Sequence, residues 1–230
     1  MNIRYVVILL LSLASACSLC AKAPKKIVAD AKKEFEIPLT EDLMREHAIL
    51  DRVLLIYEEI MNRIDARRSF PLSTLNHAVG IIQTFIESYH EKLEEEYIFP
   101  LFEKNNKEVR LVRTLKKQHV KGREITAQVK KIISKNQFLS PKDANTIKSL
   151  LKKFVTMYRP HEARESTVLF PQIRSLMSEK EFEELGEKFE AIEHALFGED
   201  GFEAMVHKVS RLEKELGIYQ LEQFTPDINA

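Results

Sequence analysis

Apolar side chains recur at alternating steps of four and three residues through much of the chain, a spacing that predicts helices with one inward face. The clearest case begins near Thr40, which is predicted to be the N-cap of a long helix. The inward positions of this helix are Leu43, His47, Leu50, Leu54, Tyr57, Met61 and Ile64. An imidazole is therefore predicted to face the core.

Three further segments repeat this spacing. One runs from about residue 73 to 101, and one follows Asn105-Asn106 and reaches about Ile133. The last opens at Ser140-Pro141, a helix cap followed by proline at the first helical position. No segment alternates polar and apolar residues as a strand would. The chain is therefore predicted to be all-α, with an up-down-up-down four-helix bundle over residues 38–177.

The last part of the chain, residues 178–230, is predicted to add further helices. Ser178 and Glu181 have the spacing of a capping box at a helix start, and Gly217 provides a stop signal for the final helix. These segments form a C-terminal helical extension, which either caps one end of the bundle or docks a partner.

The first residues have the layout of a secretory signal. Arg4 precedes a short apolar stretch that ends in small residues and is too short to span a bilayer comfortably. Residues 1–21 are therefore predicted to be a signal peptide, and the protein to be exported to a periplasm or secreted. Cleavage before Cys17 would instead give a lipid-anchored form, the one membrane association expected. Both cysteines lie in or beside the signal, so no internal disulfide is expected.

The charged residues are balanced, with 35 Lys plus Arg against 35 Asp plus Glu. No basic surplus points to nucleic acid as a partner, and a strongly acidic partner is equally unsupported. A chain of 230 residues suffices for one hydrophobic core. The oligomeric state does not follow from these properties.

The pattern His-x-x-x-Glu-x-x-x-x-Phe-Pro occurs twice in the chain, offset by 71 residues. A lone histidine precedes the first copy by 43 residues and the second by 42. Residues four apart share a helix face, so all six polar residues fall on the predicted inward faces. They are His47, His90, Glu94, His119, His161 and Glu165.

Four imidazoles and two carboxylates are the donor set of a two-metal site. Two helical hairpins related by a pseudo-twofold axis would place the paired motifs opposite each other, with Glu94 and Glu165 bridging the metals. Mixed nitrogen and oxygen donors suit iron, with manganese second, and the absence of thiolate argues against structural zinc. An open position on such a metal would accept a small diatomic molecule or peroxide.

Other polar residues of these helices are weaker candidates. Glu91 and Glu162 follow the paired histidines but are rotated by about 100° around the helix, so they are predicted to be surface charges. Tyr97 and Tyr158 are predicted to be core aromatics rather than hydrogen-bond donors to a bound ligand. Gly122 either leaves room for a pocket or permits close helix packing.

On these residues, the chain resembles the hemerythrin-like family with its HHE cation-binding domain, including the Phe-Pro after each paired motif. The resemblance spans about residues 38–177 and implies a non-haem di-iron centre inside a four-helix bundle, with the six residues as its ligands. Oxygen-carrying members place a second histidine on the third helix, where this chain has Arg123. The resemblance therefore implies the bacterial branch, whose members are linked to oxygen or redox sensing, nitric oxide response and iron-sulfur repair.

The leading hypothesis is a binding protein for oxygen or a related small molecule, since no nucleophile or acid-base pair accompanies the metal set. The alternative is a di-iron redox enzyme acting on peroxide, nitric oxide or ferrous iron, or an iron-centre repair protein. Iron storage is less favoured because the Glu-x-x-His pair expected on two helices occurs once, at Glu87 and His90. A metal-free helical interaction protein is the third hypothesis.

Overall fold

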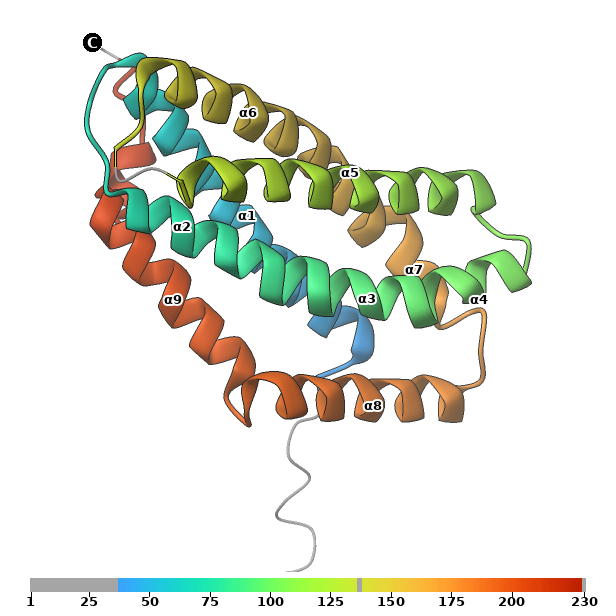
Figure 1. Cartoon of the computed structure of the whole chain (residues 1–230). Helices are drawn as coiled ribbons and strands as arrows, with labels where there is room; N and C mark the ends of the chain where they lie inside the picture. The colour runs from blue at the N-terminus through green and yellow to red at the C-terminus, as the bar shows by residue number, and fades with distance from the viewer. Residues whose placement is uncertain (1–36, 136–137, 229–230) are drawn as a thin grey trace, which may run out of the picture. The chain divides into compact units, whose positions relative to one another are not determined.

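The computed structural model describes residues 37–135 and 138–228 (Figure 1). All regular secondary structure in these two ranges is helical, which confirms the all-α prediction for this part of the chain. The predicted signal peptide at residues 1–21, with Cys17, lies outside the described residues. Within the described ranges, no helix combines the length and apolar character needed to cross a membrane.

The first helix, α1 (Leu39–Asp65), directly follows Pro38, which makes no side-chain cap. The prediction of Thr40 as the N-cap is wrong, because Pro38 has that position, two residues earlier, and two amides of the first turn donate to the Pro38 carbonyl. The predicted inward residues are buried, except Met61 and Ile64, which are partly buried and pack against the core.

The second helical segment is continuous from Leu72 to Lys104 and confirms the helix expected between about residues 73 and 101. Two stretches of it, η1 and η2, are π-helical, so their backbone hydrogen bonds reach back five residues instead of four. Its parts are α2 (Leu72–Ile81), η1 (Ile82–His90), α3 (Glu91–Leu93), η2 (Glu94–Ile98) and α4 (Phe99–Lys104).

The third and fourth segments also occupy the expected ranges. The Ser140 hydroxyl accepts a hydrogen bond from the Asp143 amide at 3.1 Å, which confirms the predicted cap, and the helix continues through Pro160. The third segment is α5 (Val109–Ile133), and the fourth comprises α6 (Pro141–Arg164), the π-helical η3 (Glu165–Leu169) and α7 (Phe170–Ile173).

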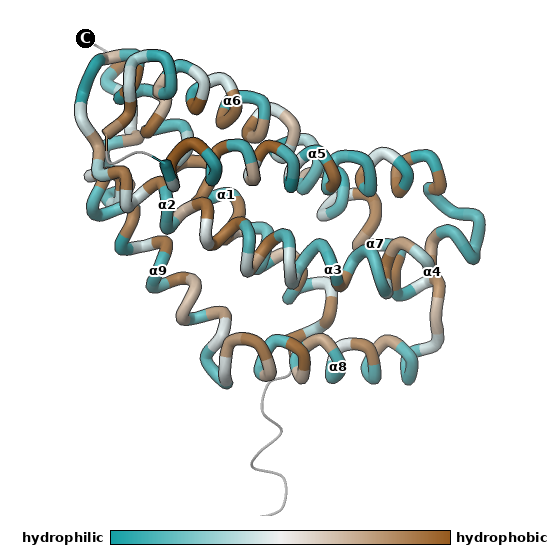
Figure 2. Tube along the Cα trace, viewed as in Figure 1, coloured by the Kyte–Doolittle hydropathy of each residue, from teal (hydrophilic) through white to brown (hydrophobic). Residues whose placement is uncertain are grey.

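These long segments pack against one another around an aromatic interior. α1 contacts α6 and α2, and α5 contacts α6, α2 and α4 (Figure 1). Hydrophobic and hydrophilic residues alternate around each helix in Figure 2, as expected for amphipathic helices that bury one face. Among the largest fully buried side chains are Tyr57, Phe85, Phe99, Phe102 and Phe154.

The predicted extension forms α8 (Glu179–Phe197), α9 (Gly201–Leu216) and the short 3₁₀ helix η4 (Leu221–Phe224). The capping box at Ser178 is confirmed, and Gly217 ends α9 in the left-handed conformation, at φ 69°. α8 packs against α1, and α9 packs against both α1 and α2. The extension therefore lies along two of the long segments.

Candidate metal centre

The structure brings the six predicted residues together from the four long segments. α1 and α5 supply one histidine each, whereas the segment from α2 to α4 and the segment from α6 to α7 each supply a histidine and a glutamate. Every one of these residues is buried, with relative exposures between 0% and 5%. They are His47, His119, His90 with Glu94, and His161 with Glu165.

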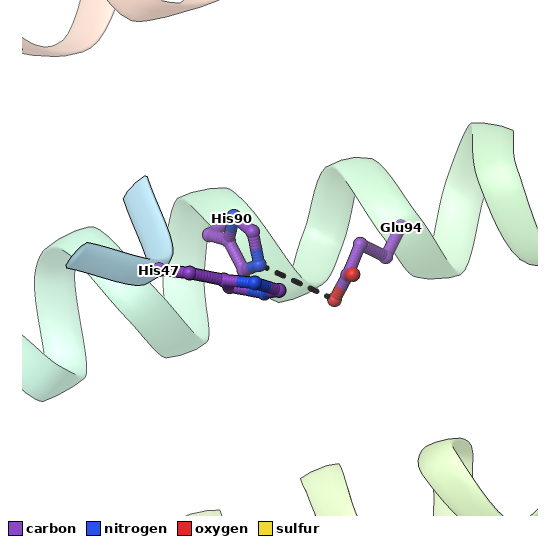
Figure 3. A group of neighbouring side chains, drawn as sticks. All are labelled: His47, His90 and Glu94. Atoms are coloured by element: carbon purple, nitrogen blue, oxygen red, sulfur yellow. Dashed lines mark ion pairs between the residues drawn. The ribbon is translucent and has the colours of Figure 1, made fainter. Parts of the chain in front are cut away.

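The six side chains form two clusters, each with two imidazoles and one carboxylate. In each cluster, one nitrogen or oxygen atom from every residue lies within 4.8 Å of the others, close enough to surround one cation. Figure 3 shows the first cluster, in which His47 from α1 lies beside His90 and both imidazoles are near the Glu94 carboxylate. The second cluster consists of His119, His161 and Glu165.

The carboxylate of Glu94 faces both clusters. Its Oε2 atom lies 3.6 Å from Nε2 of His90 in its own cluster and 3.5 Å from Nε2 of His119 in the other. A carboxylate in this position can contribute to two cations at once.

The carboxylate of Glu165 has the same relation to the two clusters. Its Oε2 atom lies 3.1 Å from Nε2 of His161 in its own cluster and 3.4 Å from Nε2 of His47 in the other. Within the second cluster, Nε2 of His119 and Nε2 of His161 are 3.2 Å apart. The geometry therefore places two carboxylates between two pairs of imidazoles.

Five polar atoms of this centre are buried without a hydrogen-bond partner. They are both carboxylate oxygens of Glu94, both carboxylate oxygens of Glu165, and Nε2 of His90. Burying such atoms unpartnered is costly in free energy. Carboxylate oxygen and imidazole nitrogen are ligands that iron accepts, so bound cations would satisfy these atoms. The residues present therefore fit a metal.

Burial and the neighbouring charges shift the pKa values of several of these side chains. It lowers the pKa of His90 and of His119 to about 4, so both imidazoles are neutral at neutral pH, the form that binds metal. Burial and the nearby Glu165 raise the pKa of Glu94. Burial acts on Glu165 in the same direction, but the neighbouring imidazoles, His161 first, outweigh it and lower the pKa of Glu165. Shared divalent cations would remove the repulsion between the two carboxylates.

Four further side chains, outside the two clusters, orient the four imidazoles. Each Nδ1 atom lies within 3.1 Å of a side-chain oxygen, which leaves Nε2 to face the centre. Partners of this kind hold both the tautomer and the angle of the ring. The pairs are His47 with Ser166, His90 with Glu46, His119 with Glu95, and His161 with Gln118.

Comparison with known families agrees with this geometry. The model of the hemerythrin HHE cation-binding domain matches residues 39–173, a span that holds both clusters. The chain belongs to the hemerythrin HHE family. Membership confirms the resemblance found in the sequence and implies that this hemerythrin domain binds a cation such as iron.

Two mycobacterial proteins are similar to this hemerythrin-family chain over most of its length. The uncharacterized proteins Rv1995 of Mycobacterium tuberculosis and Mb2018 of Mycobacterium bovis are each 44% identical to it over 214 residues. The aligned part covers 92% of this chain and 84% of each relative. No solved structure matches the chain.

Both copies of the repeated phrase contain a π-helical turn that starts at the glutamate. The Phe99 amide donates to the Glu94 carbonyl, and the Phe170 amide donates to the Glu165 carbonyl, five residues back in each case. The proline after each phenylalanine has no amide hydrogen to donate, which favours a break in the regular α-helical bonding here. Such π-helical turns recur at functional sites, and here they carry the two carboxylates.

Glu91 is 1% exposed, so its predicted place on the surface is wrong. The Tyr158 hydroxyl donates to Glu91 Oε1 at 2.6 Å, and Arg123 Nη1 donates to Glu91 Oε2 at 2.6 Å. Arg123 Nη2 also donates to Glu95 at 2.7 Å. Burial alone would raise the pKa of Glu95, but hydrogen bonds from His119 and Arg123 lower it to about 2. Arg123 thus supports the outer partner of His119.

Glu162 is buried as well, at 6% exposure, so its predicted place on the surface is also wrong. Burial, assisted by the adjacent Asp51, raises the pKa of Glu162 to about 9. Glu91 and Glu162 do lie on a different side of the helix from the paired histidines, as predicted, but neighbouring helices bury that side as well.

The two tyrosines are aromatic packing residues, as expected: Tyr97 packs on Phe189 and Tyr158 is fully buried.

Gly122 permits close helix packing rather than a pocket. A Cβ atom at this position would collide with the Tyr158 hydroxyl and lie 2.8 Å from the ring carbon Cζ. Gly122→Ala is therefore expected to displace the Tyr158 hydroxyl from Glu91 and to lower the free energy of unfolding by about 1–3 kcal/mol, measured by urea denaturation.

Gly80→Ala is the matched control, because nothing lies within 4 Å of a Cβ atom at Gly80. In that variant the higher helix propensity of alanine is expected to leave stability unchanged or slightly raised. Equal unfolding midpoints for the two variants would contradict the steric account.

Proposed function

We propose that this chain is a non-haem di-iron protein that binds or senses oxygen or a related small molecule. The observation that carries the proposal is the pair of buried carboxylates, Glu94 and Glu165, each of which lies near imidazoles of both clusters. In this proposal His47 and His90 would hold one iron, His119 and His161 would hold the other, and Glu94 and Glu165 would contribute to both sites. Iron is preferred over manganese because the matched family implies it.

Four protein donors leave an octahedral ion with open positions for a small ligand. When bound, iron supplies these positions together with redox chemistry. The protein's own contribution is a dry, aromatic enclosure: Phe170 stacks on His47 with ring centroids 5.2 Å apart, and Phe99 stacks on His119 at 5.4 Å. Both phenylalanines come from the repeated phrase. They keep water from the imidazoles of both clusters.

The proposal includes an up-down-up-down four-helix bundle formed by the four long segments. It also includes export directed by residues 1–21, with a lipid anchor at Cys17 as the alternative to a free periplasmic or secreted protein. The sequence layout of those residues supports export.

The test is the visible absorption spectrum of reduced, iron-loaded protein that lacks residues 1–21, recorded while oxygen is admitted and then withdrawn. A charge-transfer band that forms and reverses is the expected result for an oxygen-binding protein. A spectrum without any change on addition of oxygen would refute the proposal.

A rapid and irreversible change to the oxidised spectrum would favour the second candidate, a redox enzyme acting on peroxide, nitric oxide or ferrous iron, or an iron-centre repair protein. One observation supports this candidate: the buried phenol ring of Tyr158 lies 5.2 Å from the ring of His161, near enough to exchange electrons with a metal ligand. Steady-state turnover of peroxide well above that of free iron would establish it.

A further inference from the structure

A separate group of carboxylates lies at the contact between α1 and α8. Asp42 and Glu46 are one helical turn apart on α1, and Glu193 belongs to α8. One carboxylate oxygen from each of the three lies within 4.8 Å of the others. Because α8 lies beyond the residues matched by the family model, this group is not part of the family's centre.

The positively charged side chain near these three carboxylates does not fully balance their negative charge. Arg45 Nη1 lies 3.4 Å from Asp42, but Arg45 Nη2 lies 3.6 Å from Glu203, and the guanidinium stacks over the Phe202 ring at 4.0 Å. One guanidinium is therefore divided between two carboxylates at long distances. Three carboxylates this close together repel one another unless protons or a cation intervene.

The hydroxyl of Tyr89 provides a second and independent observation. Tyr89 is 1% exposed, and its hydroxyl is buried without a well-formed hydrogen bond. It lies beside Glu46 and close to Glu193 and Asp42. The ring is held in place by Phe197, at 5.4 Å between centroids. A rigid phenol oxygen is thus directed into the carboxylate group, where it lies beside Glu46 without a well-aligned hydrogen bond.

Burial raises the pKa of Asp42 to about 6 and that of Glu193 to about 7, and neighbouring carboxylates add to both shifts. These two groups would take up protons near neutral pH if nothing else balanced their charge. A bound cation would keep them ionised.

We propose that Asp42, Glu46, Glu193 and the Tyr89 hydroxyl bind a hard divalent cation of the class of Ca²⁺, Mg²⁺ and Mn²⁺. Donors that are all oxygen select this class over the softer metals. The side chain of Asp42 is 18% exposed, so solvent reaches the group at this residue. Glu46 connects the site to the iron centre, since its Oε2 atom lies 2.5 Å from Nδ1 of His90.

Terbium luminescence tests this site in the full, iron-loaded protein. Terbium is a hard cation that occupies oxygen sites, and a nearby tyrosine sensitises its emission. The chain has no tryptophan, so sensitised emission must come from tyrosine. The expected result is emission that saturates at one terbium per chain and is displaced by Ca²⁺ or Mn²⁺.

Glu193→Gln is expected to weaken terbium binding at least about 10-fold, the lower end of the effect that partners of a metal site usually have. Glu187→Gln, which removes the same charge from an exposed position of α8, is the control and is expected to change nothing. Tyr89→Phe is expected to remove most of the emission while terbium remains bound, as measured by equilibrium dialysis.

Equal terbium affinity in the Glu193→Gln and Glu187→Gln proteins would overturn the inference and show that protons alone balance the carboxylates. Failure of the proposed function is distinguishable from this result. If the natural protein takes up no iron but terbium emission still depends on Glu193, the di-iron proposal fails and the cation site stands.

Discussion

Replacing Glu94 by alanine is expected to weaken iron binding by more than about 10-fold, the lower end of the loss seen when a partner of a metal site is removed. The effect is large because this one carboxylate lies within 3.6 Å of an imidazole in each cluster, so in the proposed di-iron centre both metals would lose a donor. Iron per chain, measured after reconstitution and desalting, provides the check. Glu165→Ala is expected to behave in the same way, since Glu165 has the equivalent position.

Glu96→Ala is the matched control for this experiment. Glu96 lies on the same helical segment, two residues from Glu94, but its side chain is exposed. It is expected to bind iron as the natural protein does. Stoichiometric iron in both the Glu94 and the Glu165 variants would exclude the proposed bridging role.

The second large effect is expected for Arg123→Ala. The change leaves the buried Glu91 and the partly buried Glu95 without their guanidinium partner. Removing one partner of a fully buried pair costs about 3–5 kcal/mol. Because the Arg123 side chain is 31% exposed, solvent screening reduces the expected loss to about 2 kcal/mol. The free energy of unfolding, measured in urea, tests this value, and Arg113→Ala on an exposed part of α5 is the control.

The cost of Arg123→Ala is expected to grow with pH. Burial raises the pKa of Glu91 to about 8, above its ordinary value of 4.5, even with Tyr158 and Arg123 beside it. A raised pKa means that stability declines as pH rises until the folded protein loses the proton. In the variant this pKa is higher still, so the decline continues above about pH 8, by up to about 1.4 kcal/mol per pH unit.

A double variant, Arg123→Ala with Glu91→Gln, separates this effect from lost packing. The glutamine cannot ionise, so the added loss above about pH 8 is expected to disappear, as the pKa of Glu91 requires. A pH dependence equal to that of Arg123→Ala alone would show that Glu91 is not the group responsible.

Local spacing was sufficient to predict the helices and the six polar residues of the centre. Steps of three and four residues follow from the α-helical period, and they hold wherever one face is buried. The duplicated motif identified His90 with Glu94 and His161 with Glu165, and the structure places the imidazole and the carboxylate of each pair within 3.6 Å of each other. Caps at Ser140 and Ser178 were predictable because they depend on residues three apart.

Contacts between helices could not be predicted in this way. Each side chain that contacts the Nδ1 atom of a histidine is adjacent in sequence to one of the six residues, but the histidine that it orients lies on another helix. Glu46, for example, directly precedes His47 but orients His90. Neighbours in sequence differ by about 100° around a helix, so they point to different neighbours in space. Spacing along one helix reports none of those neighbours.

The sequence by itself determined which residues face inward, because the helical period is a local property of the chain. The tertiary structure decided how far burial extends around each helix, and it buried Glu91 and Glu162 on sides that periodicity assigned to solvent. It also decided that Glu193 lies beside Asp42, although the two are far apart in the chain. The physical reason is that packing between helices, rather than the period of any one helix, determines which polar side chains lose contact with water.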